Sequence, residues 1–274
     1  MHITSRDNSL LRQARAVRDG KIEDLIFVEG LRLCEEAQRS NLDIEAVIVS
    51  EELLRKERAA AAIDELSSTA KRVASVSEKL LESISYTKTP QGIVVLAQRP
   101  ESSEARLSAS LGTNSLLVVL HQINNPVNVG AILRTAEAAG ATGVITTSNT
   151  SDPFSPKSLR GAMGSAFRLP IWSGVSFEQV IDWCRARGMV SVCADAEANT
   201  DYTDVDWSRS SALILGPESS GFTADEFHGG KHLSHRNSVK PERAGTRRLK
   251  GQRQDAKPLD HPSEIPWVAQ TPIE

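Results

Sequence analysis

Two polar stretches of this sequence carry residue types suited to chemistry on a bound ligand. The first, Asn124–Ala136, follows the apolar run Leu116–Leu120. Asn128 is expected at or near the N-cap of a helix, where its side-chain oxygen would accept a backbone N–H. Arg134 lies one turn after Gly130, whose missing side chain leaves room for a ligand or another chain, and its guanidinium is suited to binding a phosphate or a ribose oxygen. The alternative is a capped helix whose arginine forms a surface salt bridge.

The second stretch, Leu213–Phe222, begins as a buried strand and becomes a polar loop after Gly216. Loops at the carboxyl ends of parallel strands are where α/β proteins bind nucleotides, and glycines let the backbone approach a ligand closely. Glu218 is the one carboxylate of this loop, and it is placed to orient Arg134 or to accept a hydrogen bond from a ligand. A strand followed by a glycine-rich turn is also common in proteins that bind nothing there.

The composition predicts a soluble globular protein of one or two domains: 274 residues, 39% hydrophobic, 24% charged, net charge −3. That charge gives no general sign of nucleic-acid binding, although a local basic face would be enough for it. Cys34, Cys184 and Cys193 are scattered and form no CxxC pair, which favours reduced thiols and argues against a zinc site. Since no apolar run approaches the roughly 20 residues of a membrane span and the N-terminus lacks a signal core, we expect a cytoplasmic protein.

Residues 1–99 alternate short apolar runs with helix-period segments, which predicts a small α/β domain. The expected strands are Leu25–Val28, Ile44–Val49, Arg72–Val76 and Gly92–Ala97, and the expected helices are Gly30–Gln38, Glu51–Ser67 and Glu78–Ile84. Basic residues gather in the first segment, namely Arg6, Arg12, Arg15, Arg18 and Lys21. They form either a solvated helix face or a face that contacts phosphates, with Arg12 and Arg15 as the candidate RNA-binding residues.

Residues 100–113 lose the apolar pattern and are expected to be a linker, and residues 114–228 form a second α/β unit with a mainly parallel sheet. Its expected strands are Leu116–Leu120, Val144–Thr147, Phe167–Ile171, Val190–Ala194 and Ala212–Gly216, and its helices are Val129–Ala139, Pro156–Met163, Phe177–Ala186 and one that starts after Gly221. Residues 229–274 show neither period, so we expect them to be largely disordered.

Taken together, Asn125–Ala136 and Leu213–Phe222 resemble the first and second motifs of the SpoU (TrmH) family of S-adenosylmethionine-dependent RNA 2′-O-ribose methyltransferases, which belongs to the SPOUT superfamily. Phe27–Gly30 and Pro90–Ile93 are similar to parts of the family's small L30e-like substrate-binding domain. The resemblance covers roughly residues 1–228. A nucleotide-binding enzyme unrelated to RNA is disfavoured because the chain has neither GxGxxG nor a Walker loop.

The resemblance implies a parallel sheet with a trefoil knot that binds the methyl donor, S-adenosyl-L-methionine, in a homodimer without a metal. It implies catalytic roles for Asn128, Arg134 and Glu218, donor-binding roles for Leu215, Gly216 and Gly221, and RNA contacts by Arg134 beside Arg12 and Arg15. The substrate would be ribosomal rather than transfer RNA. Because a guanidinium keeps its proton in proteins, Arg134 is expected to stabilise a developing alkoxide electrostatically.

The family's third motif, an Ile-Pro strand end followed by Ser-Leu-Asn-Val, has no counterpart in residues 228–244. Read one nucleotide later, Val239–Ala244 can encode Ser-Ser-Leu-Asn-Val, so a frameshift is one hypothesis and a divergent C-terminus is the other. Either way, the resemblance implies an incomplete knot, weak donor binding and a dimer in doubt. The alternative function is therefore a catalytically dead RNA-binding protein.

Overall fold

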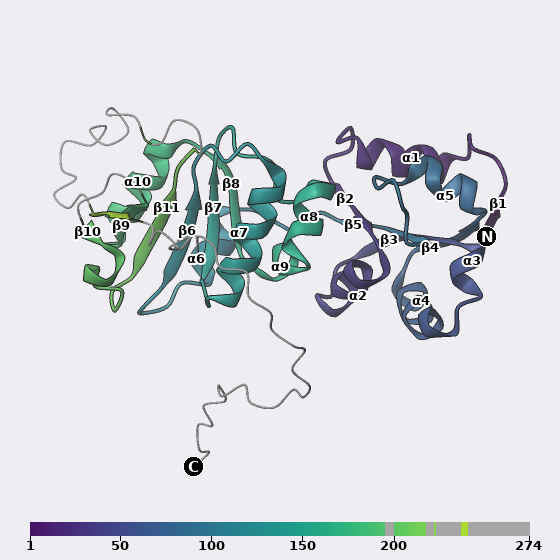
Figure 1. Ribbon diagram of the computed structural model, residues 1–274, viewed down its shortest axis with the longest axis horizontal. Helices are drawn as coiled ribbons and strands as arrows, with labels where there is room; N and C mark the ends of the chain where they lie inside the picture. The colour runs from purple at the N-terminus through teal and green to yellow at the C-terminus, as the bar shows by residue number, and fades with distance from the viewer. Residues whose placement is uncertain (195–199, 218–221, 223–236, 241–274) are drawn as a thin grey trace, which may run out of the picture. The chain divides into compact units, whose positions relative to one another are not determined.

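The structure is a computed structural model that describes residues 1–194, 200–217, 222 and 237–240. The chain divides into two units, Met1–Pro241 and Glu242–Glu274, and every element described below belongs to the first. That unit contains two separate sheets, one of five strands and one of seven (Figure 1). The strands of the first sheet come from residues 2–98 and those of the second from residues 116–240.

The N-terminal sheet has the strand order β1-β4-β3-β5-β2, parallel from β1 to β3 and antiparallel from β3 to β2. Its elements are β1 His2–Ile3, α1 Ser9–Arg18, β2 Leu25–Glu29, α2 Leu31–Arg39, β3 Ile44–Ser50, α3 Glu51–Leu54, α4 Glu57–Thr69, β4 Arg72–Val76, α5 Glu78–Ile84 and β5 Ile93–Gln98. Alternate strand residues face opposite sides, so Ile48 packs with α1 and α5 while Val47 and Val49 pack with α2 and α4.

The second sheet has the order β10-β12-β9-β11-β6-β7-β8, and all its described strand pairs are parallel, as the sequence predicted. Its elements are α6 Glu104–Ala109, β6 Leu116–Leu120, α7 Pro126–Ala138, β7 Gly143–Thr147, α8 Pro156–Ala162, α9 Ser165–Arg168, β8 Ile171–Val175, α10 Phe177–Ala186, β9 Val190–Ala194, β10 Thr200–Asp201, the 3₁₀ turn Tyr202–Asp204, β11 Ser211–Leu215 and β12 Asn237–Lys240. We call it the catalytic sheet below.

Helices cover both faces of the catalytic sheet (Figure 1). Leu117 and Val119 of β6 face α6 and α10, where Trp183 and Val180 are buried. Val118 and Leu120 face α7 and α8 in a core that continues to the α2–α4 side of the N-terminal sheet. Burial on both faces explains why these strands read as continuous apolar runs rather than as alternating ones.

Two expected elements are wrong in detail for local reasons. The strand expected at Phe167–Ile171 is instead the end of α9 followed by β8, because Pro170 cannot donate to the sheet and the strand begins only after it. The expected linker, residues 100–113, contains α6, which Ser103 caps by accepting the Arg106 N–H and which buries Leu107 completely. One buried leucine in six residues was too weak a pattern to predict that helix.

The stretch expected to be largely disordered from residue 229 contains β12, which pairs with β9 through Asn237 to Val239. An edge strand presents unpaired N–H and C=O groups that any extended segment can join without an apolar pattern. Hydrophobic periodicity therefore could not predict this strand. The expected helix after Gly221 lies outside the described residues.

The three cysteines are free, as predicted. Burial raises the pKa of the Cys34 thiol well above its usual range and that of Cys184 to about 11. Among the described residues, no three potential ligands are grouped so that they could hold a metal ion. No helix in the described part of the chain is long and apolar enough to cross a membrane.

Candidate functional site

The two polar stretches leave the catalytic sheet side by side. Leu215 at the end of β11 is level with Leu120 of β6 on one side and with Ala194 of β9 on the other. The His121 N–H donates to the Leu215 carbonyl at 2.8 Å, so the two loops are joined where they begin. Since β7 and β8 extend the sheet from β6 while β9 lies beyond β11, the strand order reverses here. Open α/β sheets bind ligands in the crevice at such a point.

The helix of the first stretch begins earlier than predicted. Asn125, rather than Asn128, is the N-cap of α7, and its side chain accepts the Val127 N–H at 3.0 Å. Pro126 occupies the first helical position, where its fixed φ favours the helix and its missing N–H costs nothing. Asn128 is therefore half-buried inside the first turn, with its N–H donated to the Asn125 carbonyl at 3.0 Å.

Gly130 makes room for a neighbouring helix of the same chain rather than for a ligand. A Cβ at Gly130 would lie 2.3 Å from the Ser158 carbonyl oxygen and 2.8 Å from the Gly161 Cα, both in α8. Gly161 meets the Gly130 backbone in return, at 3.1 Å. The predicted open space is thus filled by a close crossing of α7 and α8, which holds the site helix in place.

Arg134 is exposed on α7, while its neighbour Leu133 is buried. Within the part of the chain that the structure describes, Arg134 forms no ion pair or hydrogen bond, so the surface salt bridge considered as its alternative role is not seen there. Glu137, one turn further on, is instead bound by Arg168 at 2.9 Å. That hydrogen bond lowers the pKa of Glu137, and Arg134 keeps its guanidinium available for an anion.

Polar side chains hold the loop between β6 and α7. His121 is buried, with its Nδ1 3.0 Å from the Thr147 hydroxyl, and the Gln122 N–H donates to the same oxygen at 3.2 Å. The Ser151 hydroxyl donates to the Asn124 carbonyl at 2.6 Å. His121 and Thr147 were not predicted from the sequence, although a histidine directly after a strand of the predicted sheet was a signal for a residue at this edge.

The second stretch leaves β11 through three half-buried residues, Leu215, Gly216 and Pro217. A Cβ at Gly216 would lie 2.8 Å from the ring of Phe222, so glycine is required for that ring to pack. The Phe222 ring is stacked on His121 with a centroid distance of 6.0 Å, which joins the two stretches a second time. Glu218 and Gly221, predicted as a catalytic and a donor-binding residue, lie outside the described residues.

The basic residues of α1 have different surroundings. Arg12 is exposed, whereas Arg15 is half-buried and donates to the Arg6 carbonyl at 2.8 Å. Arg18 binds Asp19 and the Ile84 carbonyl, at 2.8 and 3.2 Å. Among the described residues, no hydrogen bond or ion pair joins Arg12 or Arg15 to the catalytic sheet.

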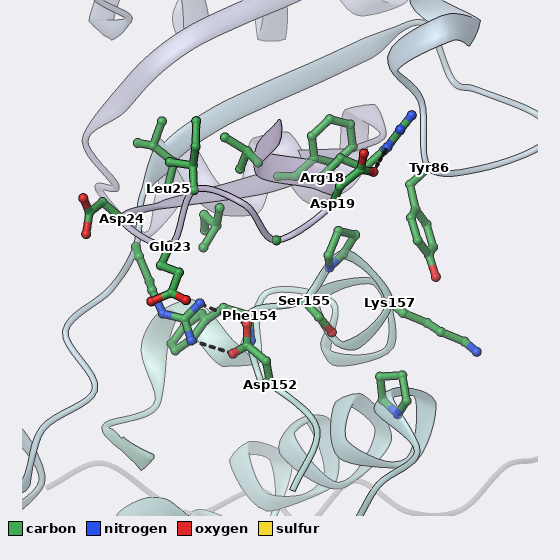
Figure 2. Close-up of a pocket in the computed structure, with 18 residues that line it drawn as sticks. Arg18, Asp19, Glu23, Asp24, Leu25, Tyr86, Asp152, Phe154, Ser155 and Lys157 are labelled. Carbon is green, nitrogen blue, oxygen red and sulfur yellow. Dashed lines mark hydrogen bonds and ion pairs between the residues drawn. The ribbon is translucent and has the colours of Figure 1, made fainter. Parts of the chain in front are cut away.

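A cavity of about 760 Å³, which the sequence did not predict, lies beside the start of α7 (Figure 2). Its walls come from distant segments of the sequence: Val17–Gly20, Ile22–Phe27, Tyr86, Arg99, Pro126, Asp152 and Phe154–Lys157. Arg99 closes one side, because its guanidinium binds Asp152 at 3.0 Å and lies 4.7 Å from the centre of the Phe154 ring. No local pattern could have revealed a site assembled in this way.

Family sequence models match both the N-terminal and the C-terminal α/β region of this chain. The sequence model of the SpoU rRNA methylase family matches residues 115–234, and that of the MRM3-like substrate-binding domain matches residues 10–95. The first match covers both polar stretches and extends slightly past residue 228, where the resemblance seen in the sequence ends.

Three individual proteins are similar to this chain over much of its length. The 23S rRNA (guanosine(2553)-2′-O)-methyltransferase RlmP of Bacillus subtilis is 28% identical over 198 residues, which are 72% of this chain and 73% of the relative. The 23S rRNA (uridine(2479)-2′-O)-methyltransferase of Streptomyces viridochromogenes is 29% identical over 56% of this chain and 54% of its own length. The crystal structure of the AdoMet-bound rRNA methyltransferase from Sinorhizobium meliloti superimposes with a TM-score of 0.73 at 26% identity, over 92% of each chain. The chain therefore contains a domain that matches the SpoU rRNA methylase family, preceded by a domain that matches the MRM3-like substrate-binding domain.

Proposed function

We propose that this protein transfers a methyl group from S-adenosylmethionine to the 2′-hydroxyl of a ribose in ribosomal RNA. The main support is the joint origin of the two polar stretches, where Leu120 and Leu215 end level and His121 bonds to Leu215. The relatives from Bacillus subtilis and Streptomyces viridochromogenes, which act on 23S rRNA, favour ribosomal over transfer RNA.

The residues at the end of β11 fit the methyl donor. Leu215, Gly216 and Pro217 are partly accessible at the end of a strand that is otherwise largely buried, so an apolar side chain and main-chain groups are available to a ligand there. A flat, mostly apolar adenine with polar edges suits such groups. When bound, S-adenosylmethionine supplies the electrophilic methyl group. We assign donor contacts to Leu215, Gly216 and Gly221.

The chemical work of the chain is to position the ribose and stabilise its charge. Arg134 would bind the ribose oxygen or the adjacent phosphate and stabilise the negative charge that develops on the 2′-oxygen. Asn128, six residues earlier on α7, would orient the same nucleotide, and Glu218 would orient Arg134. Holding two reactants in line accounts for most of the rate in such a transfer.

Arg134→Ala tests this assignment. We expect at least a 100-fold loss of tritiated methyl incorporation into ribosomal RNA, in line with removal of one electrostatic stabiliser. Arg185→Ala is the matched control, since Arg185 is a surface residue of α10 that pairs with Asp182. Equal incorporation by the two variants would refute the role of Arg134.

The second candidate is an RNA-binding protein without methyltransferase activity, favoured by the missing third motif in residues 228–244. It predicts RNA binding by the chain with neither donor binding in calorimetry nor methyl incorporation. Sequencing the gene tests the related frameshift hypothesis: a shifted frame that does not encode Ser-Leu-Asn-Val after Val239 refutes it.

We further propose that Arg12 and Arg15 lie on the RNA side of the substrate-binding domain, and that the protein acts in the cytoplasm as a homodimer. The free thiols of Cys34 and Cys184 favour a reducing compartment. The dimer follows from the family resemblance, and light scattering on the eluting protein measures it directly. A monomeric mass with full activity would refute the dimer as the active form.

A further inference from the structure

We propose that the cavity beside Tyr86 and Lys157 binds one unpaired nucleotide of the RNA, with its base stacked on Tyr86 and its phosphate at Lys157. The inference rests on the proposed function, because it takes RNA as the substrate. It adds a recognition site whose proposed binding residues, Tyr86 and Lys157, lie outside both polar stretches. The site belongs to both domains, since Tyr86 precedes β5 and Lys157 lies in α8.

A buried carboxylate fixes the backbone at Tyr86. Glu29 is only 7% exposed, and its Oε2 accepts the Tyr86 N–H at 2.9 Å and the Thr87 N–H at 3.2 Å. The Thr87 hydroxyl donates to Oε1 of the same carboxylate at 2.6 Å. Three hydrogen bonds from adjoining residues to one buried charge are strong, so the position of this loop is set before any ligand arrives.

The ring of Tyr86 remains accessible despite this anchoring. Its exposed fraction is 44%, one of the highest among the large hydrophobic residues of the described chain. An accessible aromatic ring on a fixed backbone costs little entropy to use as a stacking surface. Unpaired bases stack on such rings, whereas bases within a duplex are not accessible to them.

Charge divides the cavity into two ends. In Figure 2, Tyr86 and Lys157 lie on one side together with the ion pair of Arg18 and Asp19, and Glu23, Asp24 and Asp152 lie on the other. Asp152 is paired with Arg99, and Asp19 is paired with Arg18, which lowers the pKa of Asp19. A phosphate is therefore accommodated at Lys157 and repelled from the acidic end, where the amino groups of a base would be favoured.

Size and location agree with one nucleotide. The volume of about 760 Å³ lies within the range of small-ligand sites, roughly 300–1,000 Å³. Pro126, the first residue of α7, is part of the wall, so the bound nucleotide would lie next to the helix that carries Asn128 and Arg134. Capture of a neighbouring nucleotide here would place the target ribose at that helix.

Fluorescence anisotropy with two labelled RNAs tests the proposal: a hairpin with an unpaired seven-nucleotide loop, and a blunt duplex of the same length. We expect Tyr86→Ala to weaken hairpin binding about tenfold and to leave duplex binding unchanged, because only an unpaired base stacks. Tyr86→Phe should bind like the wild type. Tyr202→Ala is the matched control, since Tyr202 is the only other tyrosine and is 43% exposed.

Lys157→Ala tests the phosphate end. We expect the slope of log Kd against log salt concentration to fall by about 1, as for the loss of one phosphate contact. An unchanged hairpin affinity for Tyr86→Ala, or an equal loss on both RNAs, would overturn the proposal. Thermal unfolding of each variant shows whether a loss of binding reflects misfolding. If Tyr86→Ala is misfolded, the salt dependence of hairpin binding by Lys157→Ala decides whether the proposal stands.

Methyl incorporation is measured separately, so the two proposals can fail independently. Tyr86→Ala should raise the KM for RNA without changing kcat or donor binding. If the wild type binds the hairpin through Tyr86 but incorporates no methyl group, the enzyme function fails and the nucleotide site stands. If the wild type incorporates methyl groups and Tyr86→Ala has the wild-type KM for RNA, the nucleotide site fails and the enzyme function stands.

Discussion

The two faces of the catalytic sheet are tied to different parts of the molecule. On one face, α7 and α8 share a continuous apolar core with α2 and α4 of the substrate-binding domain. On the other, α6 and α10 pack around Trp183 in a core confined to the methylase domain. The helix that carries Asn128 and Arg134 is therefore the one coupled to the domain expected to hold RNA, while the second face supports the sheet alone.

Ion pairs follow the same division. Arg168 joins Glu137 of α7 to Glu36 of α2, at 2.9 and 2.6 Å, so a side chain on the α7 face connects the two domains. Arg187 joins α10 to Glu104 of α6 at 3.1 Å and stacks 4.0 Å from the centre of the Trp183 ring, entirely within the methylase domain. We expect changes on the first face to alter both stability and RNA use, and changes on the second to alter stability alone.

The largest effect is expected from Gly130→Ala. The new Cβ would meet the Ser158 carbonyl at 2.3 Å, and because that atom is backbone, α7 and α8 must separate. We expect a loss of about 3 kcal/mol in the free energy of unfolding, measured by urea denaturation. Gly112→Ala is the control, because nothing lies within 4 Å of its Cβ. Equal stability of the two variants would show that the helix crossing is looser than described.

Gly216→Ala tests the loop at the carboxyl end of β11, where we propose that the methyl donor binds. Its Cβ would displace the Phe222 ring, which lies 2.8 Å away, and a ring can move more easily than a helix backbone. We therefore expect a loss of about 1–2 kcal/mol in stability, smaller than for Gly130→Ala. Calorimetric titration should show at least tenfold weaker S-adenosylmethionine binding. Wild-type donor affinity in this variant would remove Gly216 from the proposed donor site.

Arg168→Ala removes the ion pairs that join Glu36 of α2 to Glu137 of α7. Both partners are partly exposed carboxylates, so we expect a modest loss of about 1 kcal/mol in the free energy of unfolding. We also expect a raised KM for RNA. The pKa of Glu137 is lowered chiefly by its hydrogen bond from Arg168, so its contribution to stability is present above its ordinary pKa near 4.5 and is lost as pH falls through the lower folded value. The variant should lose less stability between pH 5 and pH 3 than the wild type does. Parallel pH profiles would contradict the assignment.

Features that depend on local residue pattern were predicted from the sequence. Features that depend on contacts between distant segments of the chain were not. The apolar runs of β6 and β9 and the helix α10 were predicted with their observed bounds. That the two polar stretches belong together was implied only by the family resemblance, because the pairing of β6 with β11 joins strands far apart in the chain. Asn125 as the N-cap was missed because Asn125 and Asn128 are equally good caps, and Pro126 decides between them. The α7–α8 crossing at Gly130 and the cavity at Tyr86 depend on segments far apart in the chain, which periodicity does not relate.

The smallest effect is expected from Arg187→Ala, the counterpart of Arg168→Ala on the second face. Its side chain is 34% exposed, against 39% for Arg168, and each pairs with a glutamate of another helix. Loss of the ion pair and of the stacking on Trp183 should cost about 0.5–1 kcal/mol in thermal unfolding, because an exposed pair contributes little and the stacking slightly more. Since α6 and α10 share no core with the substrate-binding domain, the KM for RNA should stay at the wild-type value. A rise in KM equal to that of Arg168→Ala would mean that both faces transmit RNA binding, and the division between them would have to be abandoned.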